Sequence, residues 1–138
     1  MERIKFEQQL QKVIDSKSSF MSNAKWKFLF SSIQQLPVGY LTKIKLLLED
    51  EERSFSIPLK DDYINENYLE AYWGVFKLKE IEWLFIPNEI RYQRNNRAEQ
   101  LAPRIEKQDS THLLSIFQED KQFEYEVTKE GITIYGYK

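Results

Sequence analysis

The chain has 138 residues, of which 41% are hydrophobic and 14% aromatic, so it is long enough for one domain with a sizeable core. It contains no cysteine, which excludes disulfides, thiol nucleophiles and thiolate metal sites and favours a reduced cytoplasm as its compartment. The net charge of −2 is unevenly distributed: residues 1–48 carry eight basic and three acidic side chains, whereas residues 49–70 carry eight acidic and two basic ones.

No targeting or membrane segment is expected. The first six residues carry alternating charges, and no apolar run follows them that could serve as the core of a signal peptide. No segment approaches the roughly 20 apolar residues that a membrane-spanning helix needs. We therefore predict a cytoplasmic protein without membrane contact.

Two amphipathic helices are predicted at the N-terminal end. Residues 2–17 place one apolar stripe at helical spacing: Phe6, Leu10, Val13 and Ile14. Ser22 or Asn23 can cap a second helix, which ends before Pro37. Its predicted buried stripe consists of Trp26, Leu29, Phe30 and Ile33.

From residue 40 the apolar period changes from 3.6 to 2, which predicts strands. One face of the first strand carries Tyr40, Thr42, Ile44, Leu46 and Leu48, and the other face carries Lys43, Lys45 and Glu49. An acidic turn at residues 50–52 leads to a second strand and forms a hairpin. Residues 61–67 are a polar excursion, and residues 68–72 return to the sheet. Gly74 is either a bulge or a point of close approach.

Residues 72–87 contain two of the three tryptophans and the densest apolar sequence, so they are predicted to hold the centre of the sheet. Residues 81–86 alternate and then become apolar on both faces, which is typical of a central strand. We expect Trp83 to be buried, in which case its truncation costs about 3–5 kcal/mol.

Residues 88–108 show little periodicity, and Pro103 argues against one long helix. We predict a long exposed loop with a short helical turn. Its four arginines could contact phosphates, with aromatic stacking from Tyr92: Arg91, Arg94, Arg97 and Arg104. Three glutamates reduce the net charge of this loop to +2, and a solvated loop is the commoner interpretation.

The C-terminal part is predicted to contain a third helix and a hairpin. Asp109 or Ser110 can cap the helix, which carries Leu113, Leu114, Ile116 and Phe117. The hairpin pairs residues 123–127 with residues 132–137, and Gly131 suits the left-handed position of its turn. The last strand could be a sheet edge through which two copies of the chain pair as a homodimer.

A search for catalytic chemistry finds no motif. None of the four glycines lies in a nucleotide-binding pattern, and His112 is the single histidine. Four carboxylates could bind a hard metal ion, but they lack the glycine and the alternating ligands of a calcium loop: Asp61, Asp62, Glu66 and Glu70. We therefore expect neither enzymatic activity nor a cofactor.

The acidic block suggests a binding surface for a basic partner protein, because nucleic acids require cationic side chains. Its candidate residues are Glu51, Glu52, Asp61, Asp62 and Glu66. A solvated loop and turn is the commoner explanation of such a block.

Three stretches resemble those of a family of small uncharacterised bacterial proteins: Lys25-Trp26, residues 79–83 and residues 131–137. Some members of that family are similar in organisation to immunity proteins of polymorphic toxin systems. The resemblance covers residues 23–137, so residues 1–22 would be an accessory helix. It implies a cytoplasmic binding protein whose partner is another protein, such as a basic toxin domain.

Together these patterns predict a single α+β domain spanning residues 1–138. It would contain one antiparallel sheet of five or six strands, with two or three helices mainly on one face. The leading functional hypothesis is a non-catalytic, toxin-neutralising binding module. The alternative is a nucleic-acid-associated regulator that uses the arginines of residues 91–107.

Overall fold

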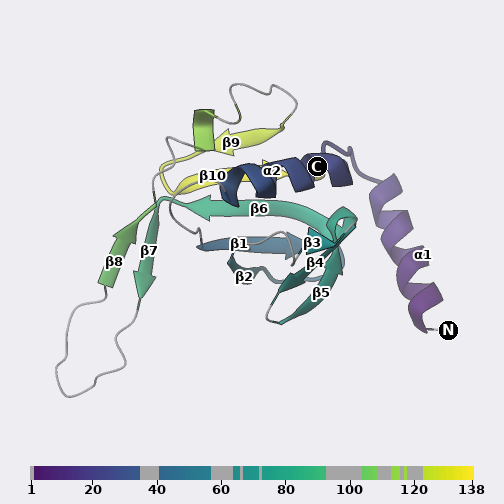
Figure 1. Cartoon of the computed structure of the whole chain (residues 1–138). Coiled ribbons are helices and arrows are strands. Elements are labelled where there is room, and N and C mark those ends of the chain that lie inside the picture. Colours follow the sequence, from purple (N-terminus) through teal and green to yellow (C-terminus); the bar gives the residue numbers. More distant parts are fainter. Residues whose placement is uncertain are drawn as a thin grey trace, which may run out of the picture.

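The computed structural model describes residues 2–34, 41–56, 64–65, 67–71, 73–92, 104–108, 113–115, 117 and 123–138. Its helical elements are α1 (Glu2–Asp15), α2 (Asn23–Gln34) and the 3-10 turn η2 (Leu78–Glu80). Its strands are β1 (Leu41–Leu46), β2 (Arg53–Ser56), β3 (Ile64–Asn65), β4 (Tyr68–Ala71), β5 (Gly74–Lys77), β6 (Ile81–Pro87), β7 (Glu89–Tyr92), β8 (Arg104–Lys107), β9 (Tyr125–Val127) and β10 (Gly131–Tyr135) (Figure 1). Residues 113–115 and residue 117 are helical, as predicted for the third helix.

The main sheet is antiparallel and has five strands in the order β2-β1-β6-β10-β9. The predicted α+β class is thus confirmed, and so is the central position of β6. The predicted β1–β2 hairpin is present, with Leu41 opposite Ser56 and Ile44 opposite Arg53. Leu84 in β6 pairs with Ile44 on one side and with Ile134 on the other, and all three side chains are fully buried.

Helix α2 covers one face of this sheet (Figure 1). The helix begins as predicted, because Ser22 Oγ accepts a hydrogen bond from the Lys25 backbone N–H at 3.2 Å. Its predicted stripe is buried: Trp26 stacks on Phe30 with ring centroids 5.8 Å apart, and Phe30 meets Phe55 of β2 edge to face at 6.2 Å. The main core therefore lies between α2 and the sheet.

Helix α1 packs on a second, smaller cluster. Leu10 is 1% exposed and lies with Leu47 and Tyr137, whereas Phe6 is 38% exposed. The predicted stripe therefore makes contact from Leu10 onward. Glu7 adds ion pairs with Lys77 and with Lys79, the latter at 3.5 Å, and so joins α1 to β5 and η2.

Residues 68–71 differ from their prediction, and so does the first part of the predicted sheet centre, residues 74–77, because neither segment joins the main sheet. Strand β4 pairs instead with β3 and β5 in a three-stranded sheet. Gly74 begins β5 at φ +150°, a conformation that L side chains rarely adopt, and an added Cβ would meet no atom within 4 Å. The need for glycine here is therefore conformational, and close approach is not its cause.

Residues 88–108 also differ from the predicted loop, because β7 and β8 form an antiparallel hairpin in which Glu89 lies opposite Lys107. Figure 1 shows these two strands extending away from the end of the main sheet. The buried side chain of Gln108 fixes their base: its Oε1 accepts from Leu41 N at 2.8 Å, and its Nε2 donates to the carbonyls of Leu41 and Pro87 at 3.1 and 2.6 Å.

Three further predictions about single positions were wrong. Trp83 is half-buried, because it lies on the sheet face that α2 does not cover. Gly131 is required for close approach, since a Cβ there would lie 2.2 Å from Ile86 O, and its φ is not in the left-handed region. The last strand, β10, is not a sheet edge, because it lies between β6 and β9.

Strand β2 is one of the two outermost strands of the main sheet, and Trp73 lies against it. The Trp73 indole Nε1–H donates a hydrogen bond to the carbonyl oxygen of Ser54 at 3.0 Å. The Arg53 guanidinium lies 4.7 Å from the centroid of the Trp73 ring, in a cation–π contact. Trp73 also stacks on Phe76 of β5, so it connects β2 to the three-stranded sheet.

Candidate functional site: the open sheet face

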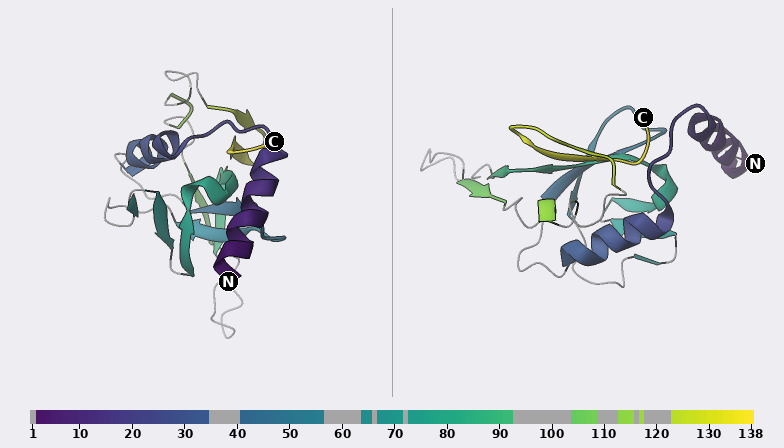
Figure 2. Two further views of the ribbon diagram at one scale, coloured as in Figure 1. Left: turned by 90° about the vertical axis from the view of Figure 1, so that its right-hand side faces the viewer. Right: turned by 90° about the horizontal axis from the view of Figure 1, so that it is seen from above.

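The face of the main sheet opposite α2 is covered by no described helix or strand. In the right-hand view of Figure 2, α2 lies on one side of the sheet and α1 lies beyond the sheet's end, so neither of these helices covers the other side. We call this surface the open face.

Strand register determines which side chains share the open face, because directly paired residues point to the same side. Lys45 pairs with Trp83, which pairs with Tyr135, and Lys43 pairs with Phe85, which pairs with Thr133. All six side chains are half-buried or exposed, in contrast to the buried residues that alternate with them. The centre of the open face is therefore aromatic: Trp83, Phe85 and Tyr135.

Ion pairs surround these aromatic rings. Glu82 accepts from Lys45 Nζ at 2.7 Å and pairs with Lys17 at 3.5 Å. Lys43 pairs with Glu52 at 3.2 Å, across the β1–β2 hairpin. Each of these lysines thus has a carboxylate partner, which neutralises its charge.

Tyr135 also has charged neighbours. Its hydroxyl donates to Glu126 Oε2 at 3.0 Å, and Lys138 Nζ lies 4.4 Å from the centroid of its ring. Partial burial and the Glu126 carboxylate raise the pKa of Tyr135 above its usual value of 10.0. The phenol is protonated at neutral pH and donates its hydrogen bond to Glu126.

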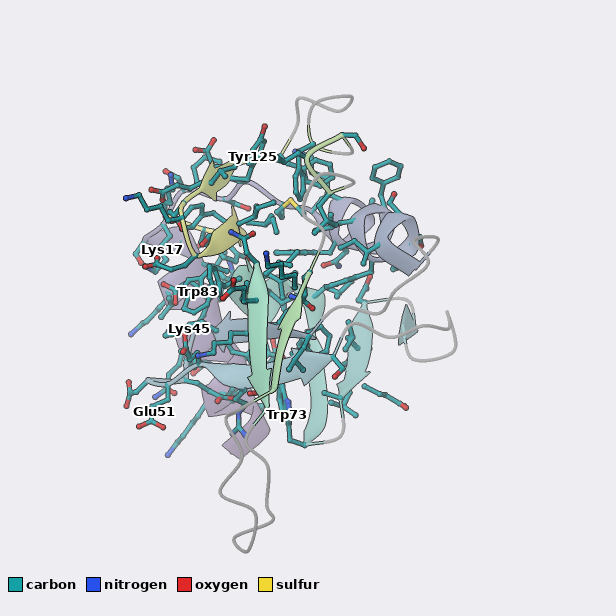
Figure 3. All side chains as sticks on the ribbon, turned by 90° about the vertical axis from the view of Figure 1, so that its left-hand side faces the viewer. Lys17, Lys45, Glu51, Trp73, Trp83 and Tyr125 are labelled. Atoms are coloured by element: carbon teal, nitrogen blue, oxygen red, sulfur yellow. The ribbon has the colours of Figure 1, made fainter. Side chains whose placement is uncertain are left out.

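The two acidic candidate residues that the structure describes, Glu51 and Glu52, flank the open face. Glu51 is exposed in the turn between β1 and β2, and Glu52 makes the pair with Lys43. Figure 3 shows Lys17, Trp83, Lys45 and Glu51 on the same side of the molecule, opposite α2. Asp61, Asp62 and Glu66 lie outside the described residues.

The other candidates are not brought together by the described structure. Arg91 and Arg104 occupy neighbouring register positions of the β7–β8 hairpin, opposite Ile105 and Tyr92 respectively. Arg94, Arg97 and His112 lie outside the described residues, and Glu70 is exposed on β4. Within the described part of the chain, no group of three or more potential ligands could hold a metal ion. No described helix has the length and apolar character needed to cross a membrane.

A groove of about 680 Å³ continues the open face at one end. Leu41, Phe85 and Pro87 supply its apolar lining. The described polar and charged residues of its lining are Thr42, Lys43, Ser54, Asn88, Glu89, Lys129 and Glu130. We call this feature the β1–β6 groove.

Sequence reasoning did not identify Phe85 or Tyr135 as surface residues, and it placed Trp83 in the core. A signal was present, because Trp83 and Phe85 alternate with the buried Leu84 and Ile86. The lysines of β1 were correctly placed on the wet face, but only the pairing of β1 with β6 shows that the aromatic residues share it.

These features define an α+β domain with a partly aromatic, open antiparallel sheet face. The chain belongs to a family of unknown function, DUF6678, whose model matches residues 10–138. No curated protein matches it, and neither does any solved structure. The family match begins within α1 at Leu10, the first buried residue among residues 4–15 of that helix, and it includes every strand of the main sheet.

Proposed function

We propose that this protein is a non-catalytic binding module that holds a partner protein on the open face. The observation that carries the proposal is the aromatic centre of Trp83, Phe85 and Tyr135 within a border of ion pairs. Protein interfaces typically combine an aromatic core with a polar rim, and the half-buried rings of the open face, bordered by charged residues, have this arrangement.

The charges favour a protein partner over a nucleic acid. Four described lysines at the open face pair with glutamates: Lys17 and Lys45 with Glu82, Lys43 with Glu52, and Lys138 with Glu124. Glu51 and Glu126 add further negative charge. Since phosphate binding requires uncompensated cations, the open face is better suited to a partner that carries basic groups.

In its specific form, the proposal is that the module neutralises a basic toxin domain in the cytoplasm by sterically blocking it. The acidic block supports this form, because Glu51 and Glu52 adjoin the open face and Asp61, Asp62 and Glu66 lie in the same acidic stretch of sequence. Opposite charges would steer a basic partner towards this side of the molecule.

Affinity capture of the tagged protein from its native lysate tests the proposal. Capture would be done at about 0.15 M salt with nuclease treatment, followed by mass spectrometry. Thr133→Arg places a bulky cation at the centre of the open face, and Val75→Arg places the same residue on β5, where Val75 is 62% exposed.

We expect wild type and Val75→Arg to retain one stoichiometric protein, and Thr133→Arg to lose it while keeping its melting temperature. Retention by Thr133→Arg would contradict binding through the open face. Loss of all captured material after nuclease treatment would instead indicate the nucleic-acid regulator, and an empty eluate from wild type would contradict a stable partner in that lysate.

A further inference from the structure

Strand β9 is an outermost strand of the main sheet, and its outer side carries backbone groups without a described partner. On its inner side, Glu124 O accepts from Tyr135 N of β10 at 2.9 Å, and Thr128 N donates to the first carbonyl of β10 at 2.8 Å. Alternate residues of an antiparallel strand bond to one neighbour, so Tyr125 and Val127 direct their N–H and C=O groups away from β10. No hydrogen bond joins these outward groups to another described residue.

The side chains of β9 differ between the two faces of the sheet. Glu126 pairs with Thr133 and therefore lies on the open face, where its carboxylate accepts from the Tyr135 hydroxyl at 3.0 Å. Tyr125 and Val127 lie on the opposite face, and Val127 is 53% exposed. A strand added beside β9 would thus meet one acidic position between two apolar ones.

The charge of Glu126 is not balanced by an ion pair within the described residues. Lys138 lies over the ring of Tyr135, but its Nζ pairs with Glu124 at 3.2 Å. Lys129, in the turn after β9, makes no ion pair with a described residue either. The described partner of Glu126 is thus a neutral phenol, and its carboxylate can still accept a basic side chain from an added strand.

The same carboxylates disfavour pairing with a second copy of this chain. Two β9 strands that pair antiparallel about Glu126 place one Glu126 directly opposite the other. Pairing about Tyr125 places Glu124 opposite Glu126. Like charges directly opposite on paired strands are destabilising, whereas opposite charges are favourable. A strand with a basic residue at this position is therefore a better occupant than a second β9.

We propose that β9 binds an extended segment of the partner protein by antiparallel strand addition, with a basic residue opposite Glu126 and apolar residues opposite Tyr125 and Val127. This inference rests on the proposed function and specifies how the partner is held. The main chain of the added strand bonds the outward groups of Tyr125 and Val127. Its basic residue lies on the open face, so the edge and the open face form one continuous interface.

The test uses the full-length protein and a lysine peptide with the inferred pattern, acetyl-Thr-Ile-Lys-Ile-Thr-amide. A second peptide carries N-methyl groups on both isoleucine nitrogens, which removes the donors for β9 but keeps every side chain. With the lysine peptide, amide chemical shifts of Tyr125, Glu126 and Val127 should change saturably, and hydrogen exchange of the Tyr125 and Val127 amides should slow. The N-methylated peptide should bind roughly tenfold more weakly.

The charge is tested separately, with a peptide in which glutamate replaces the lysine. It should bind wild type roughly fivefold more weakly than the lysine peptide, and Glu126→Gln should remove this difference. Glu70→Gln, the same change at an exposed position of β4, should leave the difference unchanged. Equal affinities of wild type for the lysine and N-methylated peptides, or for the lysine and glutamate peptides, would overturn the inference.

Substitutions of Val127 connect the edge to the captured partner. Val127→Pro removes an outward N–H that no described residue accepts, so the variant should keep its melting temperature but lose the captured protein. Val127→Thr keeps the N–H and the branched side chain, so it should retain the captured protein.

The outcomes also separate this inference from the proposed function. If Thr133→Arg loses the captured partner but Val127→Pro retains it, the open face binds the partner without β9, and only this inference fails. If the lysine peptide adds to β9 but no partner protein is captured, the edge has the inferred chemistry and the protein-binding proposal fails.

Discussion

At the scale of single residues, the three tryptophans have different roles. Trp26 lies in the core against Phe30, Trp73 connects β2 to the three-stranded sheet, and Trp83 lies half-buried on the open face. Aromatic composition predicted a core position well for Trp26, whose helical spacing also indicated burial. Aromatic composition gave the wrong position for Trp83. The alternation of residues along a strand separates the two faces of the sheet but does not show which face a helix covers.

Alanine substitutions should separate these roles energetically. Trp26→Ala removes a side chain that is 1% exposed and should lower the free energy of unfolding by about 3–5 kcal/mol. Trp83→Ala removes less buried area and should lower it by about 1–2 kcal/mol. Urea denaturation with a shared m-value measures both, and equal losses would contradict the assignment of Trp83 to the open face.

At the scale of elements, the strands with clear alternation were predictable and those with polar composition were not. The β1–β2 hairpin follows from period-2 alternation on both sides of an acidic turn. Strands β7 and β8 contain charged and polar residues, and eleven residues separate them, so their pairing left no periodic signal. Gln108 likewise has no sequence signature, although it determines where this hairpin joins the sheet.

Helix α1 offers a prediction about pH. The Lys77 hydrogen bond and charge, with Lys79, hold the pKa of Glu7 below its usual 4.5, and burial raises that of Glu80. A lowered carboxyl pKa contributes stability that is present above pH 4.5 and lost as pH falls through the lowered value. Protonation of Glu80 has the opposite effect and stabilises the folded state, because it removes a buried charge. It begins at a higher pH than the protonation of Glu7.

Loss of the Glu7 charge should therefore loosen α1 selectively. At pH 7, Glu7→Gln should accelerate amide hydrogen exchange in residues 2–15 but not in α2. In the wild-type protein, low pH should loosen residues 2–15 in the same selective way. The matched control is Asp15→Asn, because Asp15 bonds only Gln11 among the contacts of the described residues. Unchanged exchange in Glu7→Gln would show that the apolar contacts of Leu10 alone hold the helix.

At the scale of the whole molecule, the α+β class and the central position of β6 were predictable, but the strand order was not. Strands β6 and β10 pair although more than forty residues separate them, and no local pattern specifies such a contact. The separation of β3, β4 and β5 into their own sheet was missed for the same reason.

The uneven charge of the molecule predicts the kinetics of association with a basic partner. Reversing Glu51, Glu52, Asp61 and Asp62 to lysine should lower the association rate constant roughly tenfold or more at low salt, with a smaller effect at high salt. The fold should persist, since the exposed Lys43–Glu52 pair contributes at most about 1 kcal/mol. Binding kinetics at two ionic strengths measure the effect, and salt-independent rates would contradict electrostatic steering.

The contact between Trp73 and Ser54 has a consequence for self-association. An outermost strand can act as a template on which further chains add and sheets grow into aggregates. The Trp73 indole already donates a hydrogen bond to the carbonyl of Ser54, and the Arg53 guanidinium of β2 lies over its ring. A second chain that added along β2 would have to displace this indole. The contact therefore disfavours fibril growth from that edge of the sheet.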